Sequence, residues 1–411
     1  MRNKHTHRKR RKIRYDRIAV ILILLISIPY LFFMHFLHNE NKSEDLVPNE
    51  PTELPDIGSS PQTVQTEVPI QEEIYDYYYQ FLSEAEKAVY DEILESGREF
   101  STITKISTGI NLDSFSNVLV ALEYDHPEYY WFHGPSESTV NVFGNVTSVS
   151  YSADGNEQST YERIMNRAES VLNDMQAETD YEKVRYIYEW IIDNTEYDIT
   201  DSEQKQTVLS VLDEGSSVCT GYAKTFKLLC DLSGIECAVV SGVAADRNLA
   251  GGDHMWNLVR LNGQYYWVDP TWGDPLGIEG NNKNFDYLCI SDRFISIGHT
   301  ADTILRQAES GSLAVEYPEC TDDSYDYYVL NGSYFETYDA GSVEQYIAMN
   351  AAEGNMLFEM KFGSEEALNE AVQDLIQSNR IFEIVNRSSS SRYRALEYSS
   401  GSLFSLRILV K

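Results

Sequence analysis

Three residues suited to thiol chemistry follow one another along the middle of this 411-residue chain: Cys219, His254 and Asp269. A thiolate is a strong nucleophile, an imidazole takes and returns a proton, and a carboxylate holds the imidazole in one tautomer. Each residue also has an ordinary interpretation: a small buried cysteine, a hydrogen-bonded histidine at a strand end, and an Asp-Pro turn. Their order and types together predict a catalytic triad, if the fold brings them together.

The candidate nucleophile stands where a helix is predicted to begin. Apolar residues recur behind it with helical spacing as far as Gly234, which is a natural stop. Ser216 and Ser217 are candidates for the N-cap. Cys219 would then lie in the first turn, where the partial positive charge of the helix and a nearby imidazolium favour the thiolate.

A predicted hairpin connects the other two residues. The runs 255–261 and 264–269 are strand-like, and Asn262-Gly263 between them is the preferred two-residue type I′ turn. The turn pairs the residues that flank it, which puts His254 and Asp269 on one face as diagonal neighbours. Such neighbours are about 7–8 Å apart at the backbone, within reach of long side chains. We therefore predict that His254 and Asp269 touch.

The segments GSSVCTGYAKTF (215–226) and HMWNLVRLNGQYYWVDPTWGD (254–274) resemble the bacterial transglutaminase-like superfamily. Its signature combines a Cys-x-Gly-Tyr-Ala, a His-x-Trp-Asn and a Val-Asp-Pro-Thr-Trp segment, and Tyr197-Asp198 is similar to a pair found before the cysteine. The resemblance covers about residues 180–290. It implies a papain-like core with Cys219 as nucleophile, His254 as general base and acid, and Asp269 as the orienting carboxylate, working through a thioester. It does not indicate the substrate.

The N-terminus has a different composition. Nine basic residues and Asp16 give residues 1–17 a net charge of +8. Since the whole chain has a net charge of −33, the remaining residues carry −41. Residues 18–37 contain no Asp, Glu, Lys or Arg, and 20 apolar residues suffice to span a bilayer. The basic block precedes this run, which predicts a single-pass membrane anchor with the N-terminus in the cytoplasm and the bulk outside. A cleaved signal peptide is the alternative.

The remaining chain divides into four predicted parts. Residues 38–70 are rich in Pro, Glu, Ser and Thr, which is typical of a disordered stalk. A helical and hairpin region follows at 71–155, then the transglutaminase-like catalytic domain at 156–318, then a small α+β accessory domain at 319–411. The predicted fold class is α+β: a papain-like transglutaminase core with a helical N-terminal part and an α+β C-terminal module, preceded by one transmembrane helix.

Several local patterns predict individual elements. Capping boxes at Ser83-Glu86 and Thr179-Glu182 mark two helix starts. In the C-terminal module, Asn331-Gly332 predicts a strand pair over 327–337, and residues 381–385 are predicted to form a strand.

Counts of cysteine and histidine bear on cofactors. The five cysteines form no Cys-x-x-Cys pair, and the histidines of the globular part are His126, His133, His254 and His299. A two-histidine metal site would need a tertiary meeting that the sequence does not predict, so neither a metal nor another cofactor is assigned. The negative charge of the bulk disfavours nucleic acid as a partner and tolerates cationic ones.

Two classes of function remain. The first is a membrane-anchored extracellular thiol enzyme that acts on amide bonds of protein or cell-wall peptide, as a peptidase or as an acyltransferase. The second is a surface-anchored binding or scaffold module that keeps the fold without catalysis. The complete set Cys219, His254 and Asp269 favours the first.

Overall fold

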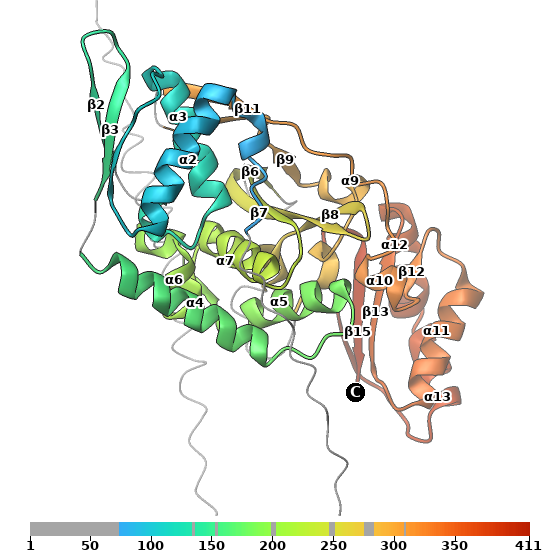
Figure 1. The fold of residues 1–411 in the computed structure, drawn as a ribbon. Helices are drawn as coiled ribbons and strands as arrows, with labels where there is room; N and C mark the ends of the chain where they lie inside the picture. The colour runs from blue at the N-terminus through green and yellow to red at the C-terminus, as the bar shows by residue number, and fades with distance from the viewer. Residues whose placement is uncertain are drawn as a thin grey trace, which may run out of the picture. The chain divides into compact units, whose positions relative to one another are not determined.

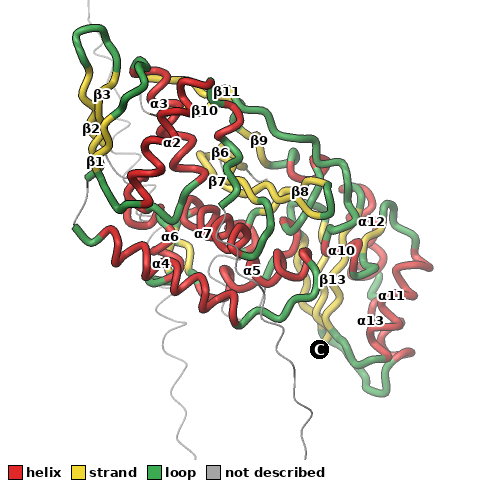
Figure 2. Tube along the Cα trace, viewed as in Figure 1, coloured by secondary structure: helices red, strands yellow, loops and turns green. Residues whose placement is uncertain are grey.

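The computed structural model describes residues 74–133, 136–152, 155–198, 203–245, 251–274, 283–307 and 310–411 (Figures 1 and 2). The predicted basic tail, anchor and stalk, residues 1–70, lie outside these ranges. Within them no helix is both long and apolar enough to cross a membrane. The longest, α4 (Glu157–Asn173), has 17 residues and carries Glu and Arg side chains. The predicted fold class is corrected accordingly: the described fold is mixed α+β, and a transmembrane helix is not part of it.

A four-stranded antiparallel sheet, ordered β8-β7-β6-β9, lies at the centre. Its strands are β6 (Cys237–Ala244), β7 (Gly252–Leu261), β8 (Gln264–Val268) and β9 (His299–Ala301). Leu261 pairs with Gln264 across Asn262-Gly263, both of which have positive φ, so the predicted turn and register are confirmed.

Both faces of this sheet are buried. Ala238, Val240, Trp256 and Leu258 belong to one hydrophobic core, while Val259 and its same-face neighbours belong to another. The first core also contains residues of α2 (Glu84–Arg98) and α3 (Leu112–Asp125), and the second contains residues of α5 (Asp180–Asn194) and α7 (Cys219–Leu232). Figure 1 shows α7 beside the sheet with α5 and α4 beyond it. Helices thus fix the sheet from two sides.

Smaller elements complete the core. Both predicted capping boxes are confirmed: Ser83 with Glu86 opens α2, and Thr179 with Glu182 opens α5. Apart from four 3-10 helical turns, the remaining elements among the described residues before 319 are short, and they are β1 (Ile103–Lys105), β2 (Ser136–Val140), β3 (Val146–Tyr151), β4 (Glu196–Tyr197), α6 (Val208–Leu212), β5 (Ser216–Ser217), α8 (Pro270–Gly273), α9 (Asp292–Ile295), β10 (Ile304–Gln307) and β11 (Ser310–Ala314). Strand β4 pairs in parallel with β5, directly before α7.

The C-terminal module has its own sheet and its own hydrophobic core. The sheet order is β12-β13-β15-β14, and helices contribute to the same core. These elements are α10 (Tyr327–Leu330), β12 (Tyr334–Phe335), α11 (Ala340–Ala352), β13 (Leu357–Phe362), α12 (Glu365–Ala371), a π-helical turn at 372–377, α13 (Arg380–Ser388), β14 (Leu396–Ser400) and β15 (Ser405–Val410).

Two predictions for this module are wrong. The strand pair over 327–337 is instead α10 followed by the short β12, because Asp326 caps the helix through the N–H of Tyr328 and the side chain of Asn331 donates back to Tyr327. The predicted strand 381–385 lies in α13. Ile381, Ile384 and Val385 are spaced to form one buried helical face there, which five residues cannot distinguish from a strand.

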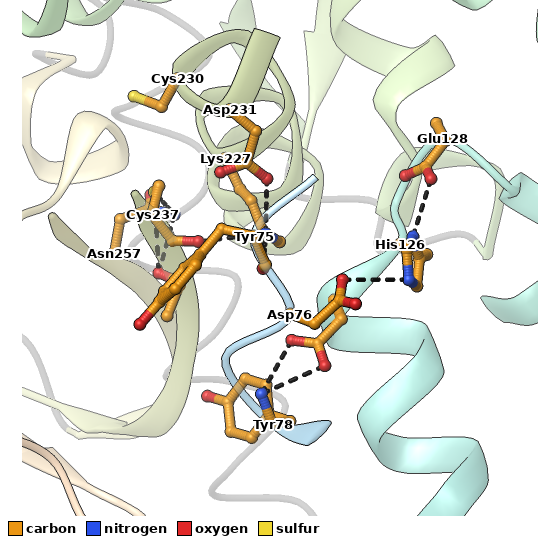
Figure 3. Close-up of polar contacts among 12 residues, drawn as sticks. Tyr75, Asp76, Tyr78, His126, Glu128, Lys227, Cys230, Asp231, Cys237 and Asn257 are labelled. Atoms are coloured by element: carbon orange, nitrogen blue, oxygen red, sulfur yellow. Dashed lines mark hydrogen bonds and ion pairs between the residues drawn. The ribbon is translucent and has the colours of Figure 1, made fainter. Parts of the chain in front are cut away.

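A buried polar group, which we call the Lys227 cluster, ties the N-terminal segment to α7 (Figure 3). Its members are the main chain of Tyr75 and the side chains of Asp76, His126, Glu128, Lys227 and Asp231. The fully buried Nζ of Lys227 donates to Asp231 Oδ2 at 2.6 Å and to the carbonyl oxygens of Tyr75 and Cys237 at 2.9 and 3.1 Å. His126 lies 2.8 Å from Glu128 and 3.2 Å from Asp76.

Candidate active site

Cys219 is the first residue of α7, as predicted, but its cap is not a serine. The N-cap is Val218, which makes no side-chain cap. Ser217 instead donates from its hydroxyl to the carbonyl of Lys205, which fixes the segment that enters the helix. All five cysteines lie within the described residues, and Cys219 alone is partly exposed while the other four are buried. The chain thus presents one accessible thiol, at the positive end of a 14-residue helix.

His254 and Asp269 meet as the hairpin register predicts. His254 Nε2 lies 2.7 Å from Asp269 Oδ2, with the carboxylate fully buried. The other carboxylate oxygen, Oδ1, accepts the N–H of Trp272 at 3.0 Å, so Asp269 also caps the short helix α8. Since Nε2 is engaged with Asp269, Nδ1 is the ring nitrogen left for Cys219.

The electrostatics couple the three predicted residues. Burial alone would lower the pKa of His254, but the Asp269 carboxylate and a hydrogen bond with Cys219 outweigh it and raise the pKa to about 10. Burial opposes ionisation of Asp269, yet the two histidines that it meets hold its pKa below the usual range. The structure thus places the thiol in one pocket with an imidazole that favours its charged form.

A fourth residue joins this group, and no local sequence pattern indicates it. His299, from β9, places its Nε2 3.0 Å from the same Oδ2 of Asp269. The meeting depends on β9 pairing with β6, where Ala244 faces His299. No local pattern links residues that are 30 positions apart, so only the tertiary structure reveals the contact.

The ligand atoms of His254, Asp269 and His299 all lie within 4.8 Å of one another, the spacing of a possible cation site among the described residues. This is the tertiary meeting of two histidines that the sequence did not predict. Both ring nitrogens already lie at hydrogen-bonding distance from the carboxylate, 2.7 and 3.0 Å, so protons account for the arrangement. A cation there would take the nitrogen by which Asp269 orients His254.

A pocket of about 840 Å³ opens onto the thiol. Cys219 and His254 both line it, together with Tyr197 and Asp198, the pair noted in the sequence. Substrate-sized volume therefore adjoins the thiol of Cys219. Fold and site together define the class of protein: a mixed α+β protein with an accessible thiol at a helix start and a His-Asp pair in the same region.

Comparison with known proteins assigns one segment of the chain to a known superfamily. Residues 169–270 match the family model described as Transglutaminase-like superfamily, so this chain contains a domain of that superfamily. Kyphoscoliosis peptidase from Homo sapiens is 36% identical over 124 residues, and the Mus musculus protein of that name is 32% identical over 124 residues. Each alignment covers 28% of this chain and 19% of the relative. The chain therefore spans about a fifth of the length of these relatives.

Further relatives are more distant. Lim and transglutaminase domain protein ltd-1 of Caenorhabditis elegans is 28% identical over 146 residues, which is 33% of this chain and 20% of that protein. A solved structure described as a TGase has a TM-score of 0.23 at 15% identity, over 44% of this chain and 52% of the other. The periplasmic domain of TgpA from Pseudomonas aeruginosa, bound to ethylmercury, has a TM-score of 0.22 at 17% identity, over 31% of this chain and 55% of the other. TM-scores this low do not establish a shared overall fold.

Proposed function

We propose that this protein is a thiol enzyme that cleaves or transfers amide bonds of a protein or peptide substrate, with Cys219 as nucleophile, His254 as general base and acid, and Asp269 as the residue that orients His254. One observation carries the proposal: the accessible thiol shares a pocket with an imidazole whose far nitrogen is held by a buried carboxylate. That is the arrangement needed for activation of a nucleophile.

The chemistry follows from these positions. His254 takes the proton of Cys219 at Nδ1, and Sγ forms a bond with the carbonyl carbon of the amide. The main-chain N–H of Cys219, at the start of α7, is a candidate donor to the oxyanion. When the C–N bond breaks, His254 returns the proton to the leaving amine and a thioester remains on Sγ. Water then gives hydrolysis, and a second amine gives acyl transfer.

The test is labelling of the intact chain with an electrophilic amide mimic, read by mass spectrometry of peptides. We expect label at Cys219, its loss in Cys219→Ala, and its retention in Cys320→Ala, which removes a buried thiol. Label that persists in Cys219→Ala and disappears in Cys320→Ala would reject the proposal. Peptide release in the absence or presence of an added primary amine then separates hydrolysis from transfer.

A second candidate function is binding without catalysis. The observation that favours it is a pocket of about 930 Å³ in the C-terminal module, lined by Phe335 of β12, by Tyr346 and Asn350 of α11, and by other residues of the module. Aromatic rings beside amide groups suit a ligand with both apolar and hydrogen-bonding parts. A scaffold would keep its partner in Cys219→Ala, with no change in the mass of that partner, whereas an enzyme would leave a modified one in the wild type only.

A further inference from the structure

His299 is buried, yet only one of its two ring nitrogens has a hydrogen-bond partner. The residue is 5% exposed and its Nε2 meets Asp269 Oδ2, but its Nδ1 is buried without a hydrogen-bond partner. Leaving such a nitrogen unpaired costs stability. The same aromatic surroundings would accept a phenyl ring with no polar atom to satisfy.

Those surroundings fix the ring tightly. The centroid of Trp272 lies 4.6 Å from that of His299 and the centroid of Trp256 lies 5.0 Å away, both edge to face. The ring of His254 stacks on the ring of Trp256, with a centroid distance of 5.9 Å and an interplanar angle of 20°. Both histidines thus pack against Trp256, and both lie at hydrogen-bonding distance from Asp269 Oδ2.

The backbone is also shaped for this approach. A Cβ on Gly242, in β6, would stand 2.2 Å from the carbonyl oxygen of Thr300 and 2.7 Å from the ring of Trp256. Glycine at this position therefore lets β9 come close enough for its first residue, His299, to reach Asp269. Any side chain there would push β9 away.

We infer that His299 is a positioning residue for the proposed reaction: its Nε2–H holds Asp269 Oδ2 in place, so that His254 keeps Nδ1 aimed at Cys219. The inference rests on the proposed function. The proton belongs on Nε2 because a proton on Nδ1 would leave a buried N–H without an acceptor. Asp269 is then held by three donors, Trp272 N–H on Oδ1 and two imidazoles on Oδ2.

The test uses iodoacetamide as a probe of Cys219, with the rate of alkylation measured by mass spectrometry on the intact chain. In His299→Phe, which keeps the ring but loses the donor, we expect the rate to fall about tenfold or more, because hydrogen bonds to charged groups have effects of that size. His299→Gln keeps an N–H and is expected to recover most of the rate. A merely structural histidine would show no such rescue at equal thermal stability.

Two outcomes overturn the inference: a rate in folded His299→Phe within about threefold of the wild type, or equal slowing in folded His299→Gln and His299→Phe. If His299→Phe does not fold, ¹⁵N-histidine NMR of the wild type decides. The proton of His299 on Nε2 supports the inference, and the proton on Nδ1 rejects it. The variant His254→Ala, measured alongside, separates the two proposals. If alkylation of Cys219 slows in His254→Ala but not in His299→Phe, only the role of His299 is rejected. If alkylation does not slow in His254→Ala, the proposed thiol enzyme is rejected.

Discussion

The site around Cys219 and the Lys227 cluster are built from similar groups, and both use α7. Each combines an imidazole with a buried carboxylate, and in each the pKa of the histidine is raised to about 10, His254 in one and His126 in the other. In both cases burial works against the charged imidazole, and neighbouring carboxylates outweigh it. A perturbed pKa therefore does not by itself mark the functional site in this protein.

The difference lies in access and in the nucleophile. In the Lys227 cluster the ammonium is surrounded by three oxygens, and the nearby thiols of Cys230 and Cys237 are fully buried (Figure 3). Around Cys219 a partly exposed thiol and His254 share a pocket. The same chemistry thus fastens the N-terminal segment in one place and faces a substrate-sized space in the other.

The sharpest contrast comes from one exchange made in both places, Asp269→Asn and Asp231→Asn. We expect the first to slow labelling of Cys219 by at least about a hundredfold, because the same exchange in a serine triad lowers turnover by roughly 10⁴ through the wrong imidazole tautomer. We expect the second to leave the labelling rate of the folded protein unchanged. Iodoacetamide kinetics of both variants measure this, and equal slowing would erase the distinction between the regions.

Stability should respond in the reverse order. Lys227→Met leaves Asp231 as an uncompensated buried charge, which we expect to lower the free energy of unfolding by about 3–5 kcal/mol. The double variant Lys227→Met with Asp231→Leu removes both charges and is expected to recover most of that loss. Urea unfolding of the single and double variants tests this. A double variant no more stable than Lys227→Met would mean that the carbonyl contacts, and not the ion pair, hold the segment.

Alkaline pH should weaken both regions, for the same reason. A histidine whose folded-state pKa is raised contributes stability that is complete below its unfolded value, about 6.5, and lost as pH rises through the folded value. For His126 and His254 that folded value is about 10. We expect the free energy of unfolding to fall between these limits, with a shallower slope in His126→Gln and in His254→Gln.

Reactivity separates the two variants in the same pH series. Labelling of Cys219 is expected to survive in His126→Gln and to be lost in His254→Gln, since His254 lines the pocket of Cys219 and His126 lies in the Lys227 cluster. A change of labelling in His126→Gln at equal stability would show that the two regions of α7 communicate.

Local signals account for the part of the site that the sequence could predict. The contact of His254 with Asp269 followed from Asn262-Gly263, because a two-residue turn sets the register of the strands beside it. His299 could not be found this way, since it reaches Asp269 only after β9 docks on β6. The prediction of a serine N-cap is wrong because the hydroxyl of Ser217 donates to the carbonyl of Lys205 and does not cap α7. Lys205 is distant in sequence from the start of that helix, so no local pattern indicates this bond.

The elements of the fold likewise fall into those that local patterns predict and those that tertiary packing decides. Capping boxes predicted the starts of α2 and α5 because both partners lie within four residues. The C-terminal errors arose where a short pattern fits two structures: Asn331-Gly332 follows a helix there and not a strand, and the run 381–385 packs as one face of α13. In these cases tertiary packing, which short windows do not contain, decides between helix and strand.

The smallest expected effect concerns charge at the open site. Asp198, Asp253 and Asp302 line the pocket, with Arg306 as a lining cation. We expect Cys219 to react faster with the cationic 2-aminoethyl methanethiosulfonate than with its anionic 2-sulfonatoethyl counterpart, after correction for their rates with free cysteine. The double variant Asp253→Asn with Asp302→Asn should reduce the preference for the cationic reagent by about two- to fivefold, the size expected for exposed charges.

Salt gives an independent check on the same preference, because ions screen exposed charges over about 8–10 Å at ordinary ionic strength. The preference should shrink at 1 M NaCl in the wild type and change less in the asparagine variant. The double variant Glu353→Gln with Glu370→Gln, at two exposed positions of the C-terminal module, is the matched control for the loss of two negative charges. If that control lowers the preference as much as the pocket variant does, the effect belongs to the net charge of −33 and not to the walls of the site.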